Sequence, residues 1–388
     1  MKLLALLLFM FPGFQASPPS ATPAPFHWHD DYTEYHLLEP ASSSFHIVYY
    51  LNQRQAGLTY VLNQTRSGSA GSDISVTDPR TGEPLKFDYM TGKELAAAGV
   101  TGRLSPEEHY IRAHLPRPVP AGGEGRVRIE KTYADAQSYF TSAETITFAR
   151  SLGIGRNAII LPAGYGLVSS NVAAEVATLG DGRIQLSFEN INSYASDVSI
   201  RAARRAGAKR LPAGATSNAF RSTKTLYEIG ADGLVAVRHE RVHWTSPERF
   251  GPDATLTTVG LEQFGSLRNV RVTDLDTGEP MAVVPPAGRG QFPSARLTPM
   301  PGTPILSANI RIEGTLREPA DIRPVGLTWS RVLFEPRATI VLPAGYEVTY
   351  VNVPVTTGTL PDGRMYLQVV NNRVASTVRL EIRAGKIE

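Results

Sequence analysis

A five-residue segment in the second half of the chain has the residue types and spacing of a zinc site. His239, Glu240 and His243 form the pattern HExxH. On a helix, two histidines four residues apart share one face and lie about 6 Å apart along the axis, so both can bind one Zn²⁺. The glutamate then serves as general base for hydrolysis. These residues therefore define a candidate zinc-hydrolase centre.

A fourth residue extends this pattern. Eighteen residues separate Glu262 from His243, and HExxH-x18-E resembles the zinc-binding motif of the M1-type aminopeptidases. The resemblance implies that His239, His243 and Glu262 would bind Zn²⁺ and that Glu240 would be the base. The sequence departs from that family because it lacks a Gly-x-Met-Glu-Asn exopeptidase motif and the Asn-Glu-Gly-Phe context around Glu262. The chain also has no room for the family's largely helical zinc domain.

The local sequence predicts a strand instead of the required helix. Val235 and Val237 are β-branched, and Asp232-Gly233 before them is a hairpin-turn signal. In a strand, residues four apart share a face but lie about 13 Å apart, too far to bind one metal ion. A short helix with Asp232 near its N-cap, ended by Pro247, stays open. We therefore favour no metal at this segment and keep zinc as the alternative.

A second histidine-rich segment lies near the expected start of the mature chain. His27, His29 and Asp31 would share one side of an extended segment. They could form a surface metal site, whereas the structural alternative is an exposed leading strand with aromatic residues packed beneath it. We favour the structural alternative. The sequence also has no GxSxG motif of a serine nucleophile.

The composition is that of a folded protein without disulfides. Hydrophobic residues make up 42% and charged residues 19% of the 388 residues, which is typical of globular chains. The absence of cysteine excludes disulfides, cysteine-based zinc sites, thiol catalysis and a lipoprotein anchor. A net charge of +3 is too small for a nucleic-acid-binding face. We therefore expect no nucleic-acid partner.

The N-terminus has the pattern of a signal peptide. One lysine precedes an apolar stretch, and small residues and prolines follow it. We assign residues 1–20 to this peptide. Its apolar core is shorter than the roughly 20 residues that span a bilayer, and no later segment is apolar enough to do so. The expected product is periplasmic or secreted, without an integral membrane segment in the mature chain.

The chain contains an internal repeat. Residues 156–165 (RNAIILPAGY) match residues 337–346 (RATIVLPAGY) at an offset of 181. Residues 76–84 (VTDPRTGEP) match residues 272–280 (VTDLDTGEP) at an offset of 196. The two offsets differ by 15 (196 − 181), which we assign to an insertion in the first copy within 91–118. Two matched blocks in the same order indicate a duplication.

The repeat predicts an all-β protein with two tandem copies of a β-sandwich-like unit. The first copy covers about 26–205 and the second about 223–388, with a linker at 206–222. Short β-prone runs follow Asp-Gly pairs, the strongest hairpin signal in a sequence. Helix is indicated only around residues 93–98. The repeated LPAGY, DGR and TGEP segments are interpreted as structural turns.

The repeat also bears on the zinc motif. Aligning the copies places residues 234–243 opposite residues 45–54, a strand-like segment (FHIVYYLNQR) that contains no HExxH. Glu262 corresponds to Arg66 at the offset of 196. The duplication therefore favours a strand for the pentad.

Two stretches of the first copy carry a resemblance to a protein family. Residues 35–45 (YHLLEPASSSF), with the following Gly68-Ser69 and TGEP, and residues 132–161 resemble an uncharacterised family of exported bacterial two-repeat β-proteins. That family is similar to the non-catalytic β-domain of M1-type aminopeptidases. The resemblance implies a periplasmic or secreted β-protein and no known substrate.

These observations favour an exported, non-enzymatic β-sandwich protein that binds a protein or a glycan at the cell envelope. The alternative is a zinc-dependent M1-like metallopeptidase that uses His239, Glu240, His243 and Glu262. A helix at residues 234–246, with Glu262 within metal distance of both histidines, would support the alternative.

Overall fold

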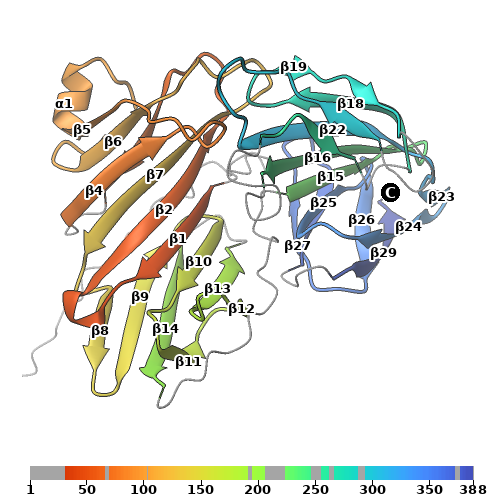
Figure 1. Cartoon of the computed structure of the whole chain (residues 1–388). Coiled ribbons are helices and arrows are strands. Elements are labelled where there is room, and N and C mark those ends of the chain that lie inside the picture. The colour runs from red at the N-terminus through yellow and green to blue at the C-terminus, as the bar shows by residue number, and fades with distance from the viewer. Residues whose placement is uncertain are drawn as a thin grey trace, which may run out of the picture.

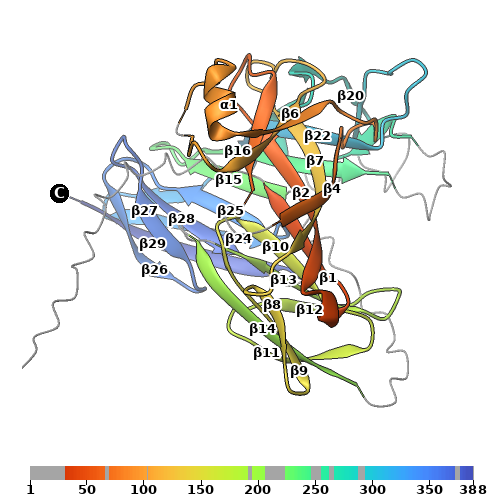
Figure 2. The ribbon, with the colours of Figure 1, turned by 90° about the vertical axis from the view of Figure 1, so that its left-hand side faces the viewer.

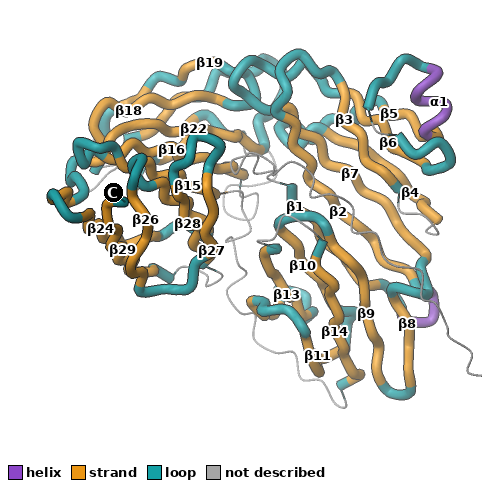
Figure 3. Tube along the Cα trace, turned by 180° about the vertical axis from the view of Figure 1, so that it is seen from behind, coloured by secondary structure: helices purple, strands orange, loops and turns teal. Residues whose placement is uncertain are grey.

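The chain forms strands almost throughout (Figure 3). The computed structural model describes residues 31–65, 70–102, 104–190, 195–205, 223–245, 255–261, 266–286, 293–371 and 376–387. Within these residues the helical segments are η1 (Pro40–Ser42) and α1 (Gly92–Ala97), which confirms the predicted all-β class. Neither is long and apolar enough to cross a membrane. The expected signal peptide at 1–20, His27, His29 and the linker at 206–222 lie outside the described residues.

The first unit contains three sheets. Its seven-stranded large sheet consists, in spatial order, of β12 (Glu175–Thr178), β13 (Ile184–Glu189), β10 (Arg156–Ile160), β1 (Tyr32–Leu37), β2 (Ser44–Gln53), β7 (Gly125–Ala134) and β4 (Ala70–Thr77). The four-stranded sheet consists of β11 (Tyr165–Ser170), β14 (Ser196–Arg204), β9 (Thr145–Leu152) and β8 (Tyr139–Ser142). The three-stranded sheet consists of β3 (Tyr60–Gln64), β6 (His109–His114) and β5 (Phe87–Thr91).

The second unit contains the same three kinds of sheet. Its large sheet consists of β19 (Glu279–Pro280), β18 (Leu267–Asp274), β22 (Ser307–Leu316), β16 (Val235–Trp244), β15 (Thr223–Ile229), β25 (Arg337–Val341), β28 (Met365–Val370) and β27 (Thr356–Thr359). The four-stranded sheet consists of β23 (Asp321–Arg323), β24 (Gly326–Leu333), β29 (Val378–Lys386) and β26 (Tyr346–Val351). The three-stranded sheet consists of β17 (Thr258–Gly260), β21 (Ser294–Arg296) and β20 (Val283–Val284).

The two units share one topology and lie side by side (Figure 1). In each, the opening strand (β1 or β15) pairs antiparallel with the next strand and parallel with the strand before the LPAGY turn (β10 or β25). The extra strand β19 has its counterpart in an isolated bridge between Thr77 and Pro84. The structure thus confirms two tandem copies of a sandwich-like unit. Figure 2 shows the first unit from its outer side, with the second unit behind it.

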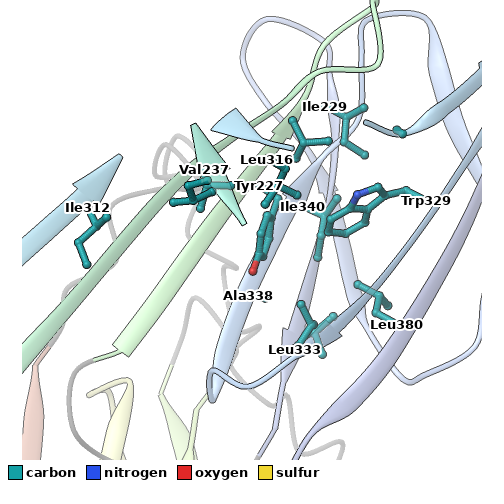
Figure 4. Close-up of a cluster of buried hydrophobic side chains, with 14 of the residues drawn as sticks. Tyr227, Ile229, Val237, Ile312, Leu316, Trp329, Leu333, Ala338, Ile340 and Leu380 are labelled. Carbon is teal, nitrogen blue, oxygen red and sulfur yellow. The ribbon is translucent and has the colours of Figure 1, made fainter. Parts of the chain in front are cut away.

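Each unit has its own hydrophobic core between the large and the four-stranded sheets. In the second unit, Tyr227 and Ile340 of the large sheet pack with Trp329 and Leu380 of the four-stranded sheet (Figure 4). The core of the first unit includes Phe148, which is fully buried. Alternating inward and outward side chains on these strands explain why the sequence shows short runs of period two.

The predicted insertion in the first copy contains α1. Thr91 accepts a hydrogen bond from the Glu94 backbone N–H at 3.2 Å, and the Glu94 carboxylate accepts one from the Thr91 backbone N–H at 2.7 Å. This capping box explains why the helix begins here. Leu95 is buried and packs with Tyr110 beneath the helix. The sequence expectation of helix around residues 93–98 is confirmed within one residue.

Candidate functional site

The HExxH pentad lies on a strand. β16 runs without interruption from Val235 to Trp244 and pairs with β15 on one side and β22 on the other. The predicted strand is therefore confirmed. The alignment of the copies is corrected by one residue, because Arg156 and Arg337, which match in sequence, lie in register with Tyr50 and Glu240 respectively. Glu240 thus corresponds to Tyr50, at an offset of 190.

The histidines and the glutamate of the pentad point to opposite faces of the sheet. Side chains alternate along a strand, so His239 and His243 share the face of Val237, which belongs to the core. Glu240 points to the other face, towards the first unit. A base on one side of a sheet cannot activate water on a metal held at the other side. The arrangement therefore differs from the one that makes HExxH a hydrolytic centre.

His239 is held as a buried neutral imidazole. Its side chain is 1% exposed, and its Nδ1 lies 2.7 Å from the Thr225 hydroxyl. Burial lowers the pKa of His239 well below its usual value, and the nearby Arg241 and His243 lower that pKa further. A neutral imidazole of this kind can lie in the core without placing a charge there.

Glu240 is the centre of a buried ion-pair cluster. Its Oε1 accepts a hydrogen bond from Arg311 Nε at 2.7 Å, and its Oε2 accepts one from Arg54 Nη2 at 2.5 Å. The Lys224 ammonium lies 3.2 Å from the same Oε2. Burial alone would raise the pKa of Glu240, but these three cations outweigh burial and hold the pKa well below its usual range. A carboxylate stabilised in this way is a poor proton acceptor.

The remaining residues of the zinc hypothesis are not brought together by the described part of the chain. Glu262 lies outside the described residues. Among the residues that the structure does describe, no group of three or more His, Asp or Glu side chains could hold a metal ion. Asp31 of the N-terminal histidine segment instead accepts hydrogen bonds from the Tyr49 hydroxyl at 2.8 Å and the Asn52 backbone N–H at 2.9 Å.

The Glu240 cluster belongs to a contact between the two units that we call the polar seam. Arg54 comes from the first unit and also pairs with Glu124, so it joins a carboxylate from each unit. Arg311 of the second unit donates a further hydrogen bond to the Gly122 carbonyl of the first, at 2.9 Å. The side chains of the seam are Arg54, Arg80, Glu124 and Arg126 of the first unit, with Glu240, Asp274, Asp276, Ser307, Asn309 and Arg311 of the second.

The repeated TGEP turns form the other half of the polar seam. Arg80 binds Asp276 at 2.8 Å and Asp274 at 2.9 Å through its two terminal nitrogens. Arg126 makes two parallel bonds to Asp276, at 2.6 and 2.7 Å. All four side chains are buried, with Arg80 only 2% exposed. These turns were interpreted from sequence as local structure, and they also carry the contact between the units.

The two aspartates of the seam have opposite pKa shifts. Burial alone would raise the pKa of Asp276, but Arg126 and Arg80 outweigh burial and lower it. Burial and the neighbouring Asp276 charge raise the pKa of Asp274. Asp276 pairs with both arginines, whereas Asp274 pairs with Arg80 alone. The sequence signal for this role was a charge difference between the two repeated turns, which have Arg80 and Asp276 at the same position.

A surface hollow of about 610 Å³ lies in the second unit. It is lined by Thr255–Thr258, Arg296, Leu297, Pro299, Met300 and Gly302–Ile305. Backbone hydrogen bonds join its walls, from Leu256 N to Ile305 O at 2.8 Å and from Leu297 N to Thr257 O at 2.9 Å. In the first unit, the loop after β6 contributes to a hollow of only about 20 Å³. The larger hollow is within the size range of ligand sites.

Comparisons with known proteins give no family. No protein-family model matches the sequence, and no curated protein matches it. Among solved structures, the chain is similar to a mutant of a two-domain M1 zinc metallopeptidase bound to L-tryptophan, with 11% identity and a TM-score of 0.29. It is similar to the M1 zinc metallopeptidase from Deinococcus radiodurans with 11% identity and a TM-score of 0.28.

Both likenesses are partial. Each covers 45% of this chain and 41% of the metallopeptidase chain, so this chain spans less than half of those neighbours. A likeness of this size carries no functional argument. The functional assignment therefore rests on the contacts of the chain itself.

Proposed function

We propose that the protein is an exported, non-enzymatic β-sandwich protein, periplasmic or secreted, that binds a protein or a glycan at the cell envelope. The observation that carries this proposal is the hollow of about 610 Å³ in the second unit. Its lining combines threonine hydroxyls and the Arg296 guanidinium with the apolar side chains of Leu256 and Met300. An apolar lining with a small number of polar groups is typical of ligand-binding pockets.

The contacts of the HExxH pentad support a non-enzymatic role. Glu240 is engaged by three cations, and His239 and His243 lie on the opposite face of the sheet. The zinc-peptidase alternative has no observation in its favour beyond the motif itself. A zinc ion there would require the two histidines to approach each other across a strand spacing of about 13 Å.

Binding is tested with arrays of cell-envelope glycans and of peptides, probed with the purified full chain. Met300→Trp would fill the hollow, and Val283→Trp is its control, because Val283 is exposed and does not line the hollow. We expect one ligand class to bind the parent and the control and to be lost with Met300→Trp. Binding that is unchanged by Met300→Trp would exclude the hollow as the site.

Metal analysis tests the alternative. The parent protein and His239→Ala are purified in the presence of Zn²⁺, and their zinc content is measured. We expect no stoichiometric zinc in either. One zinc per parent chain, lost in His239→Ala, would instead support the metallopeptidase hypothesis.

A further inference from the structure

The contacts of the polar seam are related by an approximate two-fold axis. Arg80 and Asp276 hold the same position of the two TGEP turns, because they are separated by the offset of 196 residues. Their ion pair at 2.8 Å is therefore a contact of one repeat position with itself. A two-fold arrangement of the two units places a position on the axis against its own equivalent.

A second pair of contacts obeys the same relation. β7 and β22 occupy the same place in the two large sheets, at an offset of 183 residues, so Glu124 corresponds to Ser307 and Arg126 to Asn309. Asn309 Nδ2 donates to Glu124 Oε2 at 2.6 Å. The equivalent contact is also present, because Arg126 Nη2 lies 3.3 Å from Ser307 Oγ. Each contact is the symmetry mate of the other.

A third pair lies in the strands of the pentad. At the offset of 190 residues, Arg54 corresponds to Trp244 and Tyr50 to Glu240. Arg54 binds Glu240 at 2.5 Å, and the rings of Tyr50 and Trp244 meet edge to face with centroids 5.6 Å apart. One contact is ionic and its mate is aromatic, although both join the same two positions of the repeat.

The charges on the axis differ between the units. Arg80 of the first unit corresponds to Asp276 of the second, and Arg126 corresponds to the neutral Asn309, whereas Asp274 corresponds to Asp78 and does not differ. Two first units brought together in this way would place Arg80 against Arg80 and Arg126, with Asp78 as the one nearby carboxylate, and two second units would place Asp276 against Asp276 and Asp274. Like charges forced together in a buried contact oppose association.

We propose that the polar seam is a recognition surface for another β-unit of this same fold, and that the charges at positions 80, 126 and 276 make the first unit select the second. Within one chain the linker favours the internal partner, because it holds that partner at high effective concentration. A second copy of the chain presents the same surface. It binds only when the internal contact has been broken.

Two complementary variants of the full chain test this recognition. Arg80→Asp breaks the seam but leaves the second unit's surface intact, and Asp276→Arg leaves the first unit's surface intact. Each variant alone is expected to be monomeric, with a larger radius of gyration than the parent by small-angle scattering. Mixed, the two are expected to form a 1:1 complex of about twice the monomer mass on size exclusion with light scattering, since intact surfaces then meet in trans.

The control is Arg183→Asp, which makes the same charge change at an exposed ion pair with Asp181. Circular dichroism verifies that each variant keeps its strands. Where one does not, Arg80→Met and Asp276→Asn replace it, because each removes one charge without adding the opposite one. Single variants that stay as compact as the parent, or a mixture that stays monomeric, would each overturn the proposal.

The two-fold relation has its own test. A four-residue exchange, Arg80→Asp, Arg126→Asn, Asp276→Arg and Asn309→Arg, moves the central charges to the equivalent positions across the axis. We expect its radius of gyration to return to the parent value, within error. An exchanged chain as open as Arg80→Asp would show that the two sides of the seam are not equivalent.

Discussion

Tyr50 and Glu240 occupy the same position of the repeated large sheet, and each lies at the centre of a row of side chains that faces the other unit. The row of the first unit is Arg156, Tyr32, Tyr50 and Arg128, and that of the second is Arg337, Lys224, Glu240 and Arg311. In the first, the rings stack at 6.1 Å and Arg156 lies over Tyr32 at 5.3 Å. The glutamate of HExxH, Glu240, thus places a charged carboxylate at the position where the first unit has the aromatic ring of Tyr50.

Replacing Glu240 with Gln should destabilise the protein strongly. The change leaves Lys224 and two arginines facing a neutral side chain in a buried contact, which we expect to cost about 3 kcal/mol in the free energy of unfolding. Glu313→Gln is the control, because Glu313 pairs with the half-exposed Arg238, and such pairs contribute about 0.5 kcal/mol. Urea unfolding measures both. Equal losses would contradict the role assigned to Glu240.

The Glu240 effect should depend on pH. The folded-state pKa of Glu240 is lowered, so its stabilisation is present above the unfolded pKa of about 4.3 and is lost as the pH falls below that value towards the folded pKa. The difference in unfolding free energy between the parent and Glu240→Gln should therefore narrow in acid. Urea titrations at a series of pH values from neutral downwards test this. A constant difference would be inconsistent with the assigned ion pairs.

Lys131 should also make stability rise with pH, but over a neutral-to-alkaline interval. It is buried in the first unit with Asn63 as its hydrogen-bond partner, and burial, together with the Arg150 charge, lowers its pKa to about 7. The unfolded chain then binds more protons than the folded chain between about pH 7 and 10.4. Stability gains up to about 1.4 kcal/mol per pH unit from this group over that interval.

Lys131→Met should remove this dependence and stabilise the protein at neutral pH. Lys93→Met is the matched control, because Lys93 is exposed on α1. Thermal melts of the three proteins across the same pH interval make the comparison. A parent and a Lys131→Met variant with the same pH profile would show that Lys131 does not titrate in this interval.

A methyl group at Gly123 should disrupt the seam. A Cβ there would lie 2.5 Å from the Leu275 carbonyl oxygen of the other unit. That neighbour is backbone and cannot turn aside, so we expect Gly123→Ala to cost about 1–3 kcal/mol. Gly180→Ala is the control, since its Cβ would meet no atom within 4 Å. Differential scanning calorimetry should show a lower melting temperature for Gly123→Ala alone.

Shortening a core side chain should destabilise only the unit that contains it. Phe148 is fully buried and meets the Phe45 ring edge to face, with centroids 5.4 Å apart. Phe148→Ala should cost about 3–5 kcal/mol, and Phe140→Ala should cost far less because Phe140 is 36% exposed. Hydrogen exchange followed by mass spectrometry should show faster exchange in the first unit, with little change in the second. Equal acceleration in both would mean that the two cores unfold together.

The sequence predicted local structure well because the signals for it are local. Asp232-Gly233 precedes β16, and Asp181-Gly182 and Asp362-Gly363 each lie in a hairpin of a large sheet. Tyr165 and Tyr346 begin strands after the LPAGY turns, as expected. The strand at the zinc motif was recoverable because the repeat supplied an independent copy without the motif.

The sequence did not predict the polar seam, because a contact between units leaves no periodic pattern. The signal available in the sequence was a difference in charge between two segments of the repeat that match at most positions. Arg80 and Asp276 differ in charge within matching segments that otherwise differ only at Pro79 and Leu275. The hollow beside Met300 was equally hidden, since loop residues such as Thr257 and Pro299 carry no periodicity. The exact alignment of β2 with its counterpart β16 in the other copy also could not be read from the sequence. It required the observed pairing of β2 with the strand of Tyr32 and of β16 with the strand of Lys224.

The parallel pairing in each large sheet has a consequence for how the chain folds. Tyr32 lies beside Arg156 and Lys224 beside Arg337, partners that are 124 and 113 residues apart in the chain (156 − 32 and 337 − 224). Joining such distant segments requires closing a long loop, which slows folding. A chain that completes its sheets so late stays extended for longer after synthesis, and we expect refolding from denaturant to be slow and to proceed unit by unit. Slow folding of this kind is compatible with the export that we propose.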